Sequence, residues 1–111
     1  MTVSHCDHIT TIPISNLVDK QVLIGPEQGW NDYVMRRFTL KKEGKTPHHS
    51  HPWQHIIYVL EGIGNLFLDG KDYPLTCGSV AYVPLDKEHQ ISNTGDGPFS
   101  FLCIVPKEGD F

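Results

Sequence analysis

Four of the chain's seven histidines lie in one short stretch, HHSHPWQH, which spans residues 48–55. Alternate side chains of an extended segment share a face, so His49 and His51 are expected to project together while His48 points to solvent. His55 begins the next apolar run, where a neighbouring antiparallel strand would bring its ring within reach of the first pair. Neutral imidazole is a common ligand of first-row transition metals. The stretch therefore predicts a metal site; the alternative is a solvated, histidine-rich loop that binds nothing.

This stretch and a later one resemble the two sequence motifs of the cupin family. The first motif is usually written G-x5-H-x-H-x3/4-E-x6-G, and the second G-x5-P-x-G-x2-H-x3-N. The residues that match them are Gly44, His49, His51, Gly62, Gly78, Pro84, His89 and Asn93. The two motifs are linked and therefore more specific than either alone. With compatible strands on both sides, the resemblance extends over nearly the whole chain.

The chain departs from these motifs at three places. Four residues instead of five separate Gly44 from His49. Asp86 stands where the family prefers glycine, which affects the turn before His89. Position 55, where most cupins carry glutamate, holds His55. By the resemblance, His49, His51 and His89 occupy the positions of three histidine ligands, and His55 replaces the usual carboxylate.

The resemblance implies a four-histidine site of the kind found in small microbial cupins that bind manganese or copper. We expect one divalent transition metal per chain. Manganese, iron or copper is preferred, and zinc or nickel also suits imidazole ligands. Many cupin dioxygenases are similar to one another in using the glutamate as a base, so its absence disfavours mechanisms that depend on a base.

Arg36 is the one charged residue in an otherwise apolar alternating set within YVMRRFTL, residues 33–40. A guanidinium on a buried face needs a partner. We interpret Arg36 as an anchor for an anionic or carbonyl substrate; the alternative is a salt bridge to a carboxylate at the edge of the core.

Two single positions and one N-terminal set carry further predictions. Cys103 alternates with phenylalanines in FSFLCIV, so it either lines the barrel near the metal or, as we favour, belongs to the core. Trp53 either covers the mouth of the metal site or simply packs. A second set, His5, Cys6 and His8, offers an accessory metal site, but terminal residues are commonly disordered.

Glycine and proline interrupt short runs rich in β-branched and aromatic residues, which is typical of an all-β domain. The predicted strands are residues 21–25, 33–40, 55–60, 64–68, 79–83, 89–93 and 99–105. The dipeptide Asp69-Gly70 favours a tight hairpin turn. An antiparallel double-sheet jelly roll, the double-stranded β-helix or barrel of cupins, avoids exposed edges and is the predicted architecture. We expect one domain over residues 1–111, minimal helix, and a flexible or swapped N-terminal arm at residues 1–10.

Charge and composition limit the partners. Nine basic and 13 acidic residues give a net charge of -4 with no basic run, so nucleic acid is not an expected partner. No apolar stretch approaches the roughly 20 residues of a membrane span, and there is no signal-like N-terminus, so we expect a cytoplasmic protein and no membrane. Three widely spaced cysteines indicate reduced thiols. The runs HIIYVL and FSFLCIV are apolar on both faces, which predicts a homodimer.

Four neutral ligands leave the charge of a divalent ion uncompensated and coordination positions open. The resemblance implies an oxygenase or isomerase acting on a small molecule. We interpret the protein as an oxidoreductase of the dioxygenase or oxidative C=C cleavage type, with an apolar or aromatic substrate. The pocket is expected to be lined by Phe38, Ile57, Val59, Phe101 and Cys103. A non-catalytic binding or sensor protein, a Lewis-acid isomerase and a closed structural zinc site remain alternatives.

Overall fold

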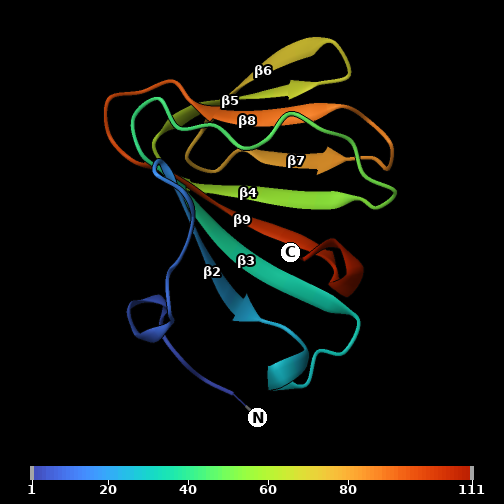
Figure 1. The fold of residues 1–111 in the computed structure, drawn as a ribbon. Helices are drawn as coiled ribbons and strands as arrows, with labels where there is room; N and C mark the ends of the chain where they lie inside the picture. The colour runs from blue at the N-terminus through green and yellow to red at the C-terminus, as the bar shows by residue number, and fades with distance from the viewer. Residues whose placement is uncertain (1, 111) are drawn as a thin grey trace.

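The computed structural model describes residues 2–110, and the regular secondary structure of these residues is almost entirely β-strand (Figure 1). The strands are β1 (Ile12–Ser15), β2 (Val18–Ile24), β3 (Tyr33–Leu40), β4 (His55–Glu61), β5 (Ile63–Leu68), β6 (Lys71–Thr76), β7 (Val80–Val83), β8 (His89–Asn93) and β9 (Phe99–Pro106). Three single-turn 3-10 helices are also present, η1 (Cys6–His8), η2 (Pro26–Gln28) and η3 (Lys107–Gly109). The prediction of an all-β fold with minimal helix is confirmed. None of the helices among residues 2–110 has the length and apolarity to cross a membrane.

The strands form two antiparallel sheets that face each other across the core (Figure 1). One sheet has six strands in the order β1-β2-β3-β9-β4-β7, and the other has three in the order β6-β5-β8. Strands distant in sequence are neighbours, as where β9 lies between β3 and β4. This double-sheet arrangement confirms the predicted jelly roll.

Local sequence explains most of the strand positions. The predicted strands at residues 33–40 and 89–93 match β3 and β8 at both ends, and β4, β5, β7 and β9 differ from prediction by a single residue at one end. Asp69 and Gly70 take positive φ angles of 49° and 86°, and they join Leu68 to its partner Lys71 in a tight hairpin. The hairpin prediction is therefore confirmed.

β6 is also absent from the predicted strands, although it forms the second half of the expected hairpin. The two strands nearest one edge of the larger sheet differ from the prediction as well. The structure adds β1, whose four residues are all exposed, and so short a strand gives little periodic signal in the sequence. It also starts β2 at Val18, three residues before the predicted position 21. Both differences follow from pairing between neighbouring strands, in which Val18 lies opposite Ser15 and Leu40.

The core lies between the two sheets and is built from the inward-facing residues of both. Its buried apolar members are Val18, Val34, Leu40, Ile57, Val59, Leu66, Leu75, Val83, Ile91, Phe99, Phe101, Cys103 and Val105. Packing is tight enough that a Cβ at Gly64 would stand 2.6 Å from the Phe99 ring. The close contact requires glycine on β5 and brings the smaller sheet onto the larger one.

Residues 6–9 of the N-terminal arm lie against the larger sheet. Gln21 Nε2 donates to the backbone oxygens of Cys6 at 2.7 Å and Ile9 at 3.1 Å. Arg37 Nη1 also donates to Cys6 Sγ at 3.3 Å. These contacts are within one chain, and exchange of this arm between two chains stays a prediction.

Candidate metal centre

The linker of residues 41–54, between β3 and β4, brings the histidine stretch to the smaller sheet. It runs along β8 and pairs with it through two isolated bridges, Lys45 with Ser92 and His49 with His89. At the second bridge, His49 N donates to His89 O at 3.2 Å and His89 N donates to His49 O at 2.9 Å. His49 and His89 are 40 positions apart in the sequence, and this pairing places their backbones directly opposite each other.

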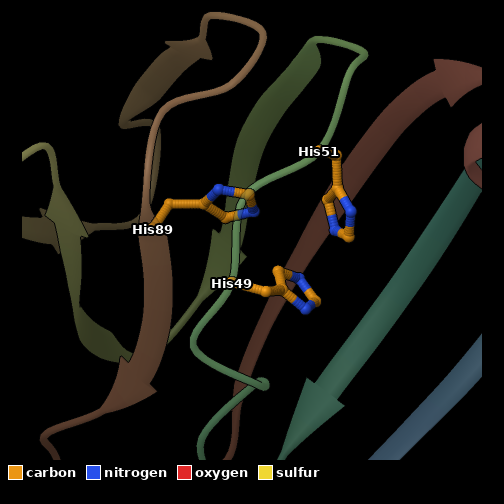
Figure 2. Close-up of side chains that lie close together, drawn as sticks. All are labelled: His49, His51 and His89. Carbon is orange, nitrogen blue, oxygen red and sulfur yellow. The ribbon is translucent and has the colours of Figure 1, made fainter.

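Three histidines form one cluster. The potential ligand atoms of His49, His51 and His89 all lie within 4.8 Å of one another. Figure 2 shows the three rings turned toward a common point, two from the linker and one from β8. The ring centroids of His49 and His51 are 3.9 Å apart, and those of His49 and His89 are 5.2 Å apart. The spacing suits a single metal ion held by imidazole nitrogens.

His55 stands beside this cluster at the start of β4. Its ring centroid lies 4.9 Å from that of His89 and 5.4 Å from that of His51, and the residue is only 7% exposed. Within residues 2–110, His55 Nε2 is buried and has no hydrogen-bond partner. A buried polar atom without a partner is costly, and a metal ion would satisfy it. The residues present therefore fit a metal, while the full four-histidine ligand set stays a prediction.

Burial lowers the pKa of three imidazoles of the site. Burial, followed by the neighbouring imidazoles of His51 and His89, lowers the pKa of His49 from 6.5 to about 4. Burial first, then His89 and Arg36, lowers the pKa of His55 to about 3. The pKa of His51 is lowered as well, mainly by burial. Neutral imidazole is the form that binds metal, so these three rings can accept an ion at pH 7 without losing a proton.

Backbone contacts fix the direction of His89 and His51. His89 Nδ1 lies 2.9 Å from Lys87 O, and because a carbonyl only accepts, this contact places a proton on Nδ1 and leaves Nε2 as the nitrogen that could bind a metal. Asp86 adopts a φ of 62°, which explains the family's preference for glycine at this position. Asp86 N donates to His51 O at 2.6 Å, so the turn before His89 also holds the linker.

A small cavity opens beside the cluster, with a volume of about 180 Å³. It is lined by Ile14, Val18, Arg36, Phe38, Thr46, Pro47, His49, His51, His55, Ile57, His89, Ile91, Phe101, Cys103 and Gly109. Phe38, Ile57, Phe101 and Cys103 line it as predicted. Val59 does not, because it lies fully buried in the core. The cavity combines an apolar wall with the four motif histidines at one side.

Arg36 is buried under this cavity, and its guanidinium is already engaged. Nη1 lies 3.6 Å from Asp110 Oδ1, and Nη2 donates to Cys103 Sγ at 3.2 Å. The guanidinium carbon also lies 4.9 Å from the centre of the Phe38 ring. Lys20 Nζ shares the same Asp110 oxygen at 2.8 Å. The structure thus contains the ion pair that the sequence offered as the alternative, and substrate anchoring by Arg36 stays a prediction.

Trp53 and Cys103 both contact histidines of the site. The Trp53 ring stacks on His51, with centroids 4.6 Å apart and an interplanar angle of 10°. Trp53 also approaches η3 closely, since a Cβ at Gly109 would lie 2.6 Å from its Nε1. Cys103 is a core residue, as favoured, but its Sγ also lies 3.4 Å from His55 Nδ1. Burial raises the pKa of the Cys103 thiol.

The remaining histidines lie outside the cluster. His48 is exposed, as predicted, and its Nε2 lies 2.8 Å from Glu88 Oε1. His5 and Cys6 form a second group of potential ligands, with Asp7 as the third member in place of His8. Arg37 donates to Cys6 Sγ there, which places a cation against the sulfur. The accessory site stays a prediction.

Sequence reasoning missed Asp110 and Ile14 as residues of this region. Asp110 follows η3 and reaches Lys20 and Arg36, and Ile14 of the exposed strand β1 lines the cavity. Neither residue belongs to a motif, and neither has neighbours in the sequence that indicate its tertiary contacts.

Comparison with known proteins agrees with this geometry. A family model described as a cupin domain matches residues 36–105, which include the histidines of both motifs. The chain belongs to the cupin family. This cupin resembles a polyketide cyclase, RemF from Streptomyces resistomycificus, with a TM-score of 0.86 and 27% identity over 96% of this chain and 79% of that one. It also resembles a predicted oxalate decarboxylase from Thermotoga maritima, with a TM-score of 0.87 and 28% identity over 95% and 98% of the two chains.

Curated relatives match over shorter stretches. Auxin-binding protein 1 of Arabidopsis thaliana is 30% identical over 78 residues, which are 62% of this cupin and 39% of the relative. Glucose-6-phosphate isomerase of Thermococcus onnurineus is 40% identical over 58 residues, 48% of this cupin and 31% of the relative. The match covers less than half of the length of these relatives.

Proposed function

We propose that this cupin is a metal-dependent enzyme that acts on a small apolar or aromatic molecule, as an oxidoreductase of the dioxygenase or oxidative C=C cleavage type. The observation that carries the proposal is a cluster of imidazoles beside an apolar cavity. His49, His51 and His89 would hold the ion, with His55 as the fourth ligand. A bound divalent metal supplies a Lewis acid, and manganese, iron or copper also supplies redox chemistry.

The cavity residues would select and orient the substrate. A volume of about 180 Å³ is close to the roughly 150 Å³ of an apolar cavity that accepts benzene. Phe38, Ile57 and Phe101 would exclude water and favour a single ring or a short apolar chain. No carboxylate of residues 2–110 lines the cavity, so the chain offers no acidic side chain there as a general base. Reactions that need no protein base are therefore favoured.

A second candidate is Lewis-acid isomerisation or cyclisation without a change of oxidation state. The similarity to a polyketide cyclase over nearly the whole chain favours it, as does the partial similarity to glucose-6-phosphate isomerases. Binding without turnover is a third, because an oxalate-binding protein of Thermotoga maritima is 36% identical over 50 residues, 45% of this cupin and 41% of that relative. The choice of metal separates the first candidate from the second, since zinc has no redox chemistry.

Metal reconstitution tests the proposal. Metal-free protein is loaded with manganese, iron, copper or zinc and offered phenols, enols, 1,3-diketones and styrene-like alkenes, while dioxygen consumption and product formation are followed. We expect dioxygen consumption with a redox-active metal and none with zinc. His51→Ala should abolish it, and His48→Ala is the matched control because His48 lies in the same linker but outside the cluster.

The other outcomes are equally informative. Full turnover with zinc and no dioxygen consumption would replace the oxidative proposal with the Lewis-acid one. Tight binding of a compound without turnover by any metal form would replace both with a binding function. Equal loss of activity in the His48 and His51 variants would contradict the assignment of His51 as a ligand.

We also propose a homodimer formed through the outer face of the larger sheet. The outward residues of β4 and β7 form an uncharged apolar face, with Ile56 and Tyr58 about half exposed and Val80 and Tyr82 more so. Their exposed fractions are 50%, 47%, 74% and 58%. A face without charge is complementary to a second copy of itself across a two-fold axis. This supports a second copy of this chain as the occupant.

A further inference from the structure

Cys103 lies between Arg36 and His55 because its strand pairs with both of theirs. In the register of the larger sheet, Cys103 on β9 is opposite Arg36 on β3 and opposite Ile57 on β4. Its side chain faces the cavity and is 3% exposed. Arg36 Nη2 donates to Cys103 Sγ at 3.2 Å, and the same sulfur lies 3.4 Å from His55 Nδ1. The sulfur therefore contacts both the guanidinium of Arg36 and the ring of His55.

The contact decides which nitrogen of His55 can bind a metal. A neutral imidazole carries its proton on one nitrogen and its lone pair on the other. If Nδ1–H donates to the sulfur, Nε2 presents a lone pair, and Nε2 is the buried atom that has no hydrogen-bond partner within residues 2–110. If the thiol instead donates to Nδ1, the proton sits on Nε2 and blocks coordination. Only the first arrangement makes His55 a ligand.

We propose that Cys103 is a positioning residue for His55: its sulfur, held in place by Arg36, accepts a hydrogen bond from Nδ1–H and turns Nε2 toward the three-histidine cluster. The inference rests on the proposed metal site. It assigns to a cysteine the supporting role that a carboxylate or backbone carbonyl usually plays for a metal-binding histidine. It also explains why the chain places a polar contact, rather than another aliphatic side chain, between Phe101 and Val105 on the inner face of β9.

Metal affinity in a double-mutant cycle tests the inference. Zinc affinity is measured by competition with a chromophoric chelator for the wild type, Cys103→Ala, His55→Ala and the double variant. Loss of a supporting contact typically weakens metal binding by roughly 10-fold to 100-fold, and we expect Cys103→Ala to do so. In the His55→Ala background the same substitution should change affinity by less than about twofold, because Cys103 acts through His55.

Val105→Ala is the matched control. Val105 lies two residues further along β9, faces the same side and is 1% exposed, so its truncation also removes buried volume without touching a histidine. We expect it to lower the melting temperature but to leave zinc affinity within about twofold of the wild type. Cys103→Ser keeps a hydrogen-bond acceptor at the same place and should retain most of the affinity.

Nitrogen-15 NMR of the metal-free protein gives a readout that does not depend on metal. We expect the wild type to show His55 protonated at Nδ1, and Cys103→Ala to show a mixture of tautomers. Three results would overturn the inference. The first is a wild-type His55 that carries its proton on Nε2. The second is an equal loss of zinc affinity in Cys103→Ala and Val105→Ala, and the third is a Cys103→Ala effect on zinc affinity that is as large in the His55→Ala background as in the wild type. If Cys103→Ala does not fold, the zinc affinity of Cys103→Ser and the tautomer of His55 in the wild type test the inference instead. A wild type that binds no metal would defeat the proposed function, while the tautomer would still test the role of Cys103.

Discussion

Acidification should destabilise the metal-free protein through His55. In the folded chain, burial together with His89 and Arg36 lowers the pKa of His55 to about 3, whereas the ordinary value is 6.5. As the pH falls through 6.5, the unfolded chain takes up a proton at this position and the folded chain does not. The unfolded state therefore binds more protons, and stability that is complete above this pH is lost progressively down to about pH 3.

The size of the effect follows from the difference in protonation. At pH 5 a histidine of the unfolded chain is almost fully protonated, while His55 in the fold is neutral. The contribution of this one residue to the free energy of unfolding is then smaller at pH 5 than at pH 7 by about 2 kcal/mol. This figure depends little on the folded pKa, provided that it lies below about 5.

Urea denaturation of the wild type and His55→Gln measures the effect, with a chelator present to keep the protein metal-free. The free energy of unfolding is compared at pH 7, 6 and 5. We expect the wild type to lose about 2 kcal/mol more than the variant between pH 7 and pH 5. Equal losses in the two proteins would show that folded His55 takes up a proton as readily as the unfolded chain, and would refute the account of His55 as a neutral imidazole in the fold.

Two further predictions concern the contacts around the site and the outer sheet face. Asp110→Asn removes the carboxylate that Lys20 and Arg36 share, and because these cations are buried we expect chemical denaturation to show a loss of about 2 kcal/mol in unfolding free energy; unchanged stability would mean that the ion pairs contribute nothing. Tyr58→Glu places a charge in the apolar face of β4, and light scattering should show a monomer for this variant and a dimer for the wild type. A wild type that is already monomeric at micromolar concentration would refute the proposed homodimer.

Local patterns in the sequence predicted much of the fold. Alternation and the Asp69-Gly70 turn identify strands because they reflect backbone preferences that each segment carries by itself. The shared face of His49 and His51 follows from the same two-residue period. His89 is different: no local property of KEHQ indicates a ligand, and only the second cupin motif linked it to the first pair.

The contacts around Arg36 could not be predicted from local sequence patterns. Its alternation with apolar residues predicted burial and a partner, and both are present. The identity of the partner depends on the path of the chain after β9, which brings Asp110 beneath β3. Cys103 was favoured as core for its apolar neighbours, and its contact with His55 depends on the register of three strands. Such contacts between distant segments depend on tertiary structure, and the alternation of apolar and polar residues along one segment does not reveal them.

The histidine cluster also lies where the two sheets meet. No strand of the larger sheet pairs with a strand of the smaller one within residues 2–110. His55 belongs to the larger sheet, His89 to the smaller one, and His49 to the linker that pairs with β8 of the smaller sheet. An ion held by all of these side chains would be a removable cross-link at one end of the sandwich, so that separating the layers and releasing the metal become the same event.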